Sequence, residues 1–159
     1  PRITRVVASS VSFDVNQYAS PFEQKIARFA LKHMRGFTNK QILKQMEKDP
    51  QAAWFYDHLM HITRKETPLE AAESLSQINE ENLHSELVTQ DVMIQTGLDD
   101  HLVPFKMHNL QVEALINAKS VTPLVFTEEV QGQNHCQVGN FGLALDLILD
   151  WLDKKGTNG

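Results

Sequence analysis

The chain has 159 residues, of which 42% are hydrophobic and 22% are charged, a composition typical of one soluble globular domain. Its formal net charge of −5 argues against nucleic acid or an anionic membrane as a partner. No apolar run approaches the roughly 20 residues of a membrane span, and no signal-peptide pattern is present. The single cysteine excludes an internal disulfide and fits a reducing compartment, so we expect a cytoplasmic protein.

Three short runs are predicted to form strands, over residues 3–9, 91–96 and 121–127. Each is mostly apolar and bounded by polar residues, which is typical of strands buried on both faces of a parallel sheet. Pro123 cannot donate a hydrogen bond to a neighbouring strand, so we expect the third strand at an edge of the sheet.

Between the first two strands, start signals predict about four helices from residue 21 to about residue 83. Ser20, Pro21 and Glu23 form a capping-box pattern that opens the first helix, which should end before Gly36. Further helix starts are predicted at the patterns Thr38/Gln41, Asp49/Pro50 and Thr67/Glu70.

The second and third strands are each followed by a predicted helix, over residues 104–118 and 141–154. The last helix is apolar on all but a narrow stripe of aspartates, so we expect it to be largely buried. Strand–helix alternation predicts an α/β fold of about three parallel strands with flanking helices. We therefore divide the chain into a first strand and loop (1–19), a helical insertion (20–85) and a C-terminal α/β part (86–159).

Two polar loops are predicted at the same edge of this sheet. The second strand ends in "GLDD" (97–100), and the third is followed by "QNHCQVGN" (133–140). Functional groups of open parallel sheets gather at the carboxyl ends of the strands, so Asp100 and His135 should meet there. A buried carboxylate that accepts from imidazole Nδ1–H leaves Nε2 free to take a proton from a nucleophile, and histidine titrates near working pH. The two residues are therefore a candidate acid–base pair.

From Ile3 to Lys155 the chain resembles the C-terminal part of an α/β-hydrolase, with its closest likeness to bacterial serine hydrolases of the dipeptidyl aminopeptidase or acylaminoacyl-peptidase type. "GLDDHLVP" is similar to the acid loop of that family, with an Asp three residues after Gly97 and a Pro four residues after Asp100. "NHCQVGN" followed by "LALDLILDWL" is similar to its final histidine segment. The resemblance implies that Asp100 and His135 belong to a Ser-His-Asp triad and that residues 20–85 form a cap, or lid.

The nucleophile motif of that family, G-x-S-x-G, does not occur in this chain. Ser9, Ser10 and Ser12 follow a strand but lack the flanking glycines. We therefore expect a C-terminal fragment of a serine hydrolase of ester, amide or peptide bonds, with a small-molecule or peptide substrate and no cofactor or metal, and inactive by itself. The alternative is a non-catalytic interaction module that pairs with itself or another chain through the exposed edge of the first strand.

The same residues and their neighbours allow other roles. Asp99 is the rival of Asp100 as the acid, and Cys136 or one of the three serines is a rival nucleophile. A metal site is a further alternative, although no H-x-x-x-H or H-E-x-x-H pair supports it. Its candidate ligands are Asp99, Asp100, His101, His108 and His135. Outside such a site, His101 and His108 are expected to face solvent or line the edge of the sheet.

Overall fold

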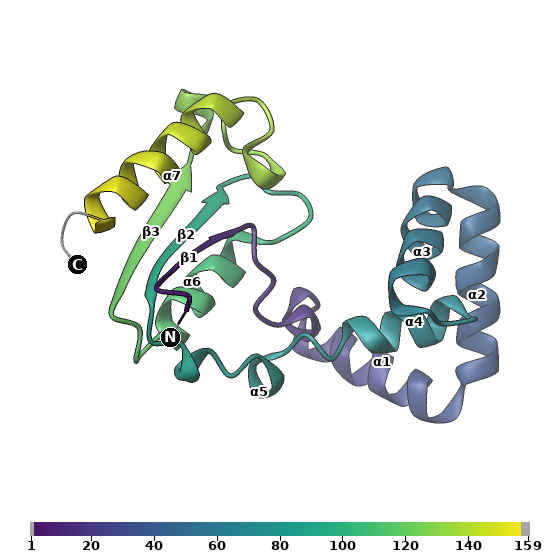
Figure 1. Ribbon diagram of the computed structural model, residues 1–159. Coiled ribbons are helices and arrows are strands. Elements are labelled where there is room, and N and C mark those ends of the chain that lie inside the picture. Colours follow the sequence, from purple (N-terminus) through teal and green to yellow (C-terminus); the bar gives the residue numbers. More distant parts are fainter. Residues whose placement is uncertain (1, 157–159) are drawn as a thin grey trace. The chain divides into compact units, whose positions relative to one another are not determined.

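The computed structural model describes residues 2–156 and contains a three-stranded parallel sheet with flanking helices (Figure 1). This is an α/β arrangement, as the alternation of strands and helices predicted. The chain forms two compact units. One spans residues 14–82, and the other combines the segment up to Phe13 with the segment from Leu83 onward.

The sheet consists of β1 (Arg5–Ser9), β2 (Asp91–Gly97) and β3 (Ser120–Phe126), in that order. Every residue of β2 is buried, because β2 has a neighbouring strand on each side. β3 pairs with β2 alone among the described strands, which confirms the edge position predicted from Pro123. The carbonyl of Phe126 accepts a hydrogen bond from the loop after β2, so the backbone groups of Phe126 face β2. The backbone groups of successive strand residues face opposite sides, and Pro123 lies three residues earlier. The nitrogen of Pro123 therefore faces the open side of β3.

Helices α6 (Phe105–Ala114) and α7 (Phe141–Gly156) cover opposite faces of the sheet (Figure 1). On the α6 face, Val92 and Ile94 pack in one apolar cluster with Leu115. On the α7 face, the Trp151 indole donates to Thr122 Oγ1 at 3.0 Å. Side chains of successive strand residues alternate between these two layers. The loops that leave the carboxyl ends of the strands are therefore anchored to a covered sheet.

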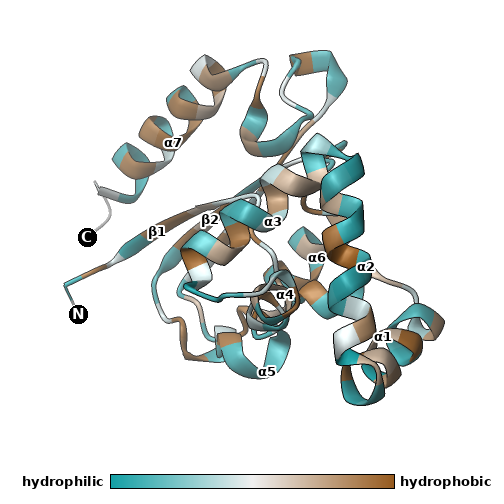
Figure 2. Cartoon of the chain, turned by 90° about the vertical axis from the view of Figure 1, so that its right-hand side faces the viewer, coloured by the Kyte–Doolittle hydropathy of each residue, from teal (hydrophilic) through white to brown (hydrophobic). Residues whose placement is uncertain are grey.

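Two expectations for these helices are wrong. α6 ends at Ala114 rather than near residue 118, because Leu115 leaves the helical conformation and packs in the core. α7 is not largely buried, since Leu145 and Leu149 are 57% and 59% exposed. Its apolar turns alternate with polar ones in Figure 2. The physical reason is that α7 contacts the sheet along one side only, through residues such as Trp151.

The 14–82 unit is helical. It contains α1 (Pro21–His33), α2 (Arg35–Lys48), α3 (Pro50–Thr63) and α4 (Pro68–Leu75), and α5 (Glu80–Leu83) begins in it. Short 3-10 turns lie at Val15–Tyr18 here and at Ser85–Leu87, Glu128–Val130 and His135–Gln137 in the other unit.

The helix starts in this unit follow the sequence signals with one exception. The capping box of Ser20 and Glu23 is present, and Asp49 and Thr67 also cap their helices as predicted. The start predicted at Thr38 is wrong, because α2 begins at Arg35 and continues through that position. The Thr38 hydroxyl donates to the carbonyl of Met34, one turn earlier, instead of capping.

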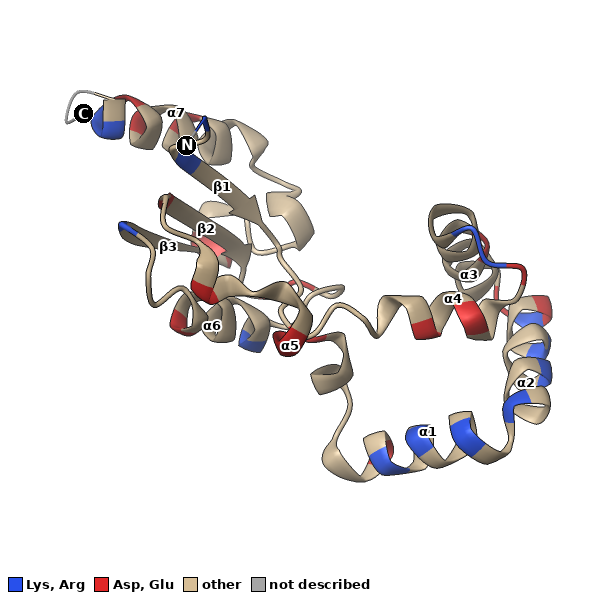
Figure 3. Ribbon diagram, turned by 60° about the horizontal axis from the view of Figure 1, so that its bottom comes forward, with Lys and Arg blue, Asp and Glu red and all other residues tan. Residues whose placement is uncertain are grey.

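Basic residues gather on α1 and α2 (Figure 3). Residues 21–48 carry seven Lys or Arg and two Glu, whereas the whole chain has a net charge of −5. These two helices therefore carry a net positive charge, although the chain as a whole is acidic. None of the helices within residues 2–156 has the length and apolar character needed to cross a bilayer.

Asp91, at the start of β2, links this strand to β3 and to α7. Its carboxylate accepts from Ser120 Oγ at 2.5 Å and from Lys155 Nζ of α7 at 3.2 Å. The hydrogen bond from Ser120 is the largest cause that lowers the pKa of Asp91 to about 2, with Lys155 and Lys119 adding to it and burial opposing it.

We expect this carboxylate to make the stability of the fold depend on pH. Because its ordinary pKa is 3.8, its contribution is present above about pH 4 and is lost as the pH falls towards 2. Asp91→Asn should flatten the decline in the free energy of unfolding over that window, as measured by urea titration at each pH. Asp150→Asn, on the exposed side of α7, should leave the decline unchanged. Equal slopes for Asp91→Asn and the wild type would contradict this role.

Candidate functional site

The loop after β2 is tied by its backbone to the strand and loop beside it. The Leu98 N–H donates to the Phe126 carbonyl, and the Asp99 N–H donates to the Gln133 carbonyl, both at 2.9 Å. The second bond joins the loop that carries Asp100 to the loop that carries His135. The relative position of the two loops is thus set by the main chain.

Gly97 allows the two loops to approach each other closely. A Cβ atom at this position would lie 2.1 Å from the Gln133 carbonyl oxygen and 2.5 Å from that of Asn134. Both distances are far below van der Waals contact, and the opposing atoms belong to the backbone, which cannot turn aside as a side chain can. Only glycine fits at this end of β2.

The Asp100 carboxylate is held by its own loop. Its Oδ1 accepts hydrogen bonds from the backbone N–H groups of Leu102 and Val103, each at 2.9 Å. Bonds of an Asp side chain to N–H groups two and three residues later stabilise a turn and restrict the side chain. The side chain is fully buried, with 0% exposure. Asp100 is therefore fixed in place before any partner is considered.

His135 meets this carboxylate from the loop after β3. Its Nδ1 lies 3.0 Å from Oδ1 and 2.9 Å from Oδ2 of Asp100. The side chain of His135 is 29% exposed, in contrast to that of Asp100. Because Nδ1 faces the acid, Nε2 lies on the opposite side of the ring. The structure therefore brings together the two residues that the sequence singled out.

Two opposing effects act on the pKa of Asp100. Burial raises it, but hydrogen bonds from the backbone of Val103 and Leu102, from the His135 ring and from the Ser10 hydroxyl lower it. The hydrogen bonds prevail, and the pKa lies below its ordinary value. Asp100 is consequently ionised at neutral pH.

The ionised state of Asp100 determines what the imidazole of His135 can do. A carboxylate only accepts hydrogen bonds, so Nδ1 of His135 must carry the proton in this contact. In the neutral ring Nε2 then holds a lone pair and can accept a proton. The arrangement is that of a general base oriented by a buried acid.

The rival residues lie in different environments. Asp99 contributes its backbone to the contact between the loops, while the residue is exposed. The exposed His101 ring lies edge-to-face with the His135 ring, with centroids 6.4 Å apart. His108 does not face solvent, which was one of the two expectations for it. His108 is 5% exposed on α6 and stacks on Phe105, and burial lowers its pKa.

The metal alternative gains no support from the geometry. Within residues 2–156, no three His, Cys, Asp or Glu side chains are grouped so that they could hold an ion. Cys136 is a free thiol next to His135, and its backbone N–H donates to Ser10 Oγ at 3.1 Å.

Sequence reasoning missed the contacts that two residues make with the histidine loop. Ser9 Oγ donates to Gln137 Oε1 at 2.9 Å, and Ser10 Oγ accepts from Cys136 as described above. The sequence by itself indicates the two serines only as rival nucleophiles. The signal that could have identified them is their place at the carboxyl end of β1, the same edge at which both loops lie.

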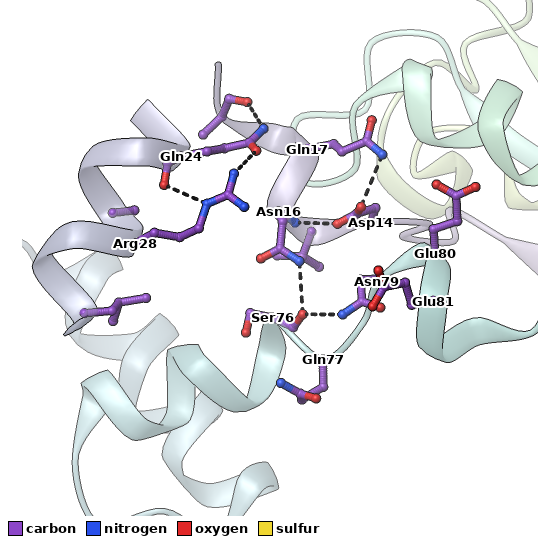
Figure 4. Close-up of a pocket in the computed structure, with 14 residues that line it drawn as sticks. Asp14, Asn16, Gln17, Gln24, Arg28, Ser76, Gln77, Asn79, Glu80 and Glu81 are labelled. Carbon is purple, nitrogen blue, oxygen red and sulfur yellow. Dashed lines mark hydrogen bonds between the residues drawn. The ribbon is translucent and has the colours of Figure 1, made fainter. Parts of the chain in front are cut away.

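A separate hollow of about 620 Å³ lies within the 14–82 unit (Figure 4). Its polar groups are mainly bonded to its own walls: Asn16 and Asn79 donate to the Ser76 carbonyl, and Arg28 donates to Gln24. The buried polar atoms that lack a partner among the described residues all lie elsewhere. We therefore place the candidate site at Asp100 and His135.

Comparison with known proteins adds no second source of information. No family model matches the chain, and no curated protein or solved structure is significantly similar to it. The function is therefore inferred from the geometry of this site and from the motifs that form it.

Replacing Gly97 by Ala should destabilise the protein by about 1–3 kcal/mol, because the new Cβ must push the two loops apart. Gly142→Ala is the matched control in the same unit, since a Cβ there meets nothing within 4 Å. It should be neutral or slightly stabilising in a helix. Urea unfolding of both variants measures the difference. A wild-type free energy of unfolding for Gly97→Ala would show that the loops do not approach so closely.

Proposed function

We propose that this chain supplies the acid and the histidine of a serine hydrolase that acts on ester, amide or peptide bonds. The observation that carries the proposal is the contact of 2.9 to 3.0 Å between His135 Nδ1 and the buried, ionised Asp100. His135 takes the proton of the attacking hydroxyl and then delivers it to the leaving group. Asp100 holds the ring in the reactive tautomer and stabilises the imidazolium that forms.

The nucleophile, in this proposal, lies outside the described residues. The hydroxyl of Ser9 is bonded to Gln137, and that of Ser10 is bonded to Cys136 and Asp100. Ser10 thus lies on the acid side of the pair rather than beside Nε2. The similarity of "GLDDHLVP" and "NHCQVGN" to the acid and histidine loops of α/β-hydrolases supports the same assignment.

The tautomer of His135 tests the acid–base pair directly. In the wild type, neutral His135 should carry its proton on Nδ1, as measured by the ¹⁵N shifts of its ring. In Asp100→Asn the side-chain amide can donate to Nδ1, so the proton should move to Nε2 and the base should be lost. Asp99→Asn is the matched control and should leave the tautomer unchanged. A wild-type ring protonated on Nε2 would contradict the proposed role.

The hydrolase itself is tested in a longer polypeptide, expressed with the coding sequence upstream of Pro1. It should hydrolyse nitrophenyl esters and bind a fluorophosphonate on a serine outside residues 1–159. Asp100→Asn should lower kcat by about 10⁴-fold. An activity that survives His135→Ala, or a label on Ser9 or Ser10, would rule out the proposed division of roles.

β1 favours a second candidate function, an interaction module. β1 pairs only with β2 among the described strands, and even-numbered residues such as Ser10 bond to β2. The N–H and C=O groups of Arg5, Val7 and Ser9 therefore face the open edge. A mostly apolar hollow of about 330 Å³, lined in part by Val6 and Ile94, lies on the adjoining face. We propose that a second copy of the chain pairs along this edge.

Edge pairing predicts that Val7→Pro abolishes self-association without unfolding the sheet, because the N–H of Val7 makes no bond to β2. Val6→Pro is the opposite control, since it removes a bond of the β1–β2 ladder and should destabilise the fold. Sedimentation velocity and urea unfolding distinguish the two effects. A wild-type chain that sediments as a monomer at its highest soluble concentration would exclude this second function.

A further inference from the structure

Two consecutive serines at the end of β1 hold the residues that follow His135. Ser9 Oγ donates to the side-chain oxygen of Gln137 at 2.9 Å. Ser10 Oγ accepts the backbone N–H of Cys136 at 3.1 Å. One dipeptide thus binds the two residues immediately after the proposed base, across a separation in sequence of more than 120 residues.

The turn that carries His135 needs such support. Cys136 and Gln137 both have a positive φ, of 51° and 57°, a conformation that residues other than glycine adopt only at some energetic cost. Gln137 is 1% exposed, and Ser9 holds its amide oxygen while its nitrogen has no partner among the described residues. Contacts from β1 therefore stabilise a conformation that the turn would not keep by itself.

Ser10 is itself fixed in place. It is 8% exposed, its backbone N–H donates to the Gln95 carbonyl of β2 at 2.9 Å, and its φ is 49°. A buried, left-handed residue immediately after a strand aims its side chain in one direction. This direction brings the hydroxyl to the turn after His135.

The hydroxyl of Ser10 can serve both members of the acid–base pair. It has one proton to donate and lone pairs to accept with. The Ser10 oxygen accepts a hydrogen bond from the N–H of Cys136. The hydroxyl proton of Ser10 is left to donate to the carboxylate of Asp100, with which Ser10 is hydrogen-bonded. Ser10 therefore connects the acid to the loop of the base.

We propose that Ser9 and Ser10 are positioning residues, which hold the His135 ring against Asp100 from the end of β1. The inference rests on the acid–base role proposed above for that pair. It gives the two serines a function other than nucleophilic attack. It also makes β1 part of the site, although β1 carries neither the acid nor the base.

The test measures how fast the Nδ1 proton of His135 exchanges with water, from its low-field proton resonance, which His135→Gln identifies by its loss. Loss of one hydrogen bond of ordinary strength should raise the exchange rate roughly fivefold. We expect this increase in Ser10→Ala, Ser10→Gly and Ser9→Val. Ser9→Thr keeps the hydroxyl on a side chain of the same shape as Val, and should retain the wild-type rate.

The pairs of variants distinguish the effect of the serine hydroxyls on the exchange rate from the effect of the serine backbone. Glycine accepts a positive φ without strain, so wild-type exchange in Ser10→Gly would show that only the backbone of Ser10 matters, and would overturn its proposed role. Equal exchange in Ser9→Val and Ser9→Thr would overturn that of Ser9. If the wild type gives no low-field resonance, the Asp100–His135 pair itself fails. If the resonance is present and no serine variant changes it, only the present inference fails.

Discussion

The close contact between the loop after β2 and the loop after β3 is the constraint on which the candidate site depends. At Gly97 the two main chains lie so close that no side chain fits between them, and the N–H of Asp99 bonds across the same gap to Gln133. The backbone therefore fixes the relative positions of the two loops that carry Asp100 and His135. Their hydrogen bond forms between groups that the chain already holds together, which reduces the conformational entropy lost in forming it.

The buried carboxylate is the second element of this arrangement. An isolated carboxylate in a low-dielectric interior would tend to take up a proton. The N–H groups of Leu102 and Val103 counter this tendency, because they bond to the charged form and come from the same turn as Asp100 itself. A charged acceptor thus faces Nδ1 of His135 at neutral pH, so the proton of the neutral ring lies on Nδ1 and the lone pair on Nε2. The proposed chemistry requires both the burial and the two backbone donors.

β1 connects the two functions that we propose. Its inner edge bonds to β2, its end presents Ser9 and Ser10 to the histidine loop, and its outer edge is open among the described residues. A chain that paired with the outer edge would contact the backbone of Ser9, whose side chain supports Gln137. The edge proposed for association and the two serines that contact the histidine loop therefore lie on one strand.

The sequence determined the features that depend on neighbouring residues or on topology. The capping box of Ser20 and Glu23 forms within one turn, and Pro123 lacks a donor in any environment, so it places β3 at an edge. The contact between Asp100 and His135 could be anticipated because parallel strands end at a common edge. Its catalytic role stays a prediction.

Only the tertiary structure decided which groups from distant parts of the chain would meet. The burial of His108, the exposed leucines of α7 and the hold of Ser9 and Ser10 on the histidine loop have no local signature, since each depends on which layer covers a residue. A short-range sequence pattern predicts which local structure and which kinds of hydrogen bond a residue can form. Its actual partner is determined only when segments far apart in sequence pack against each other.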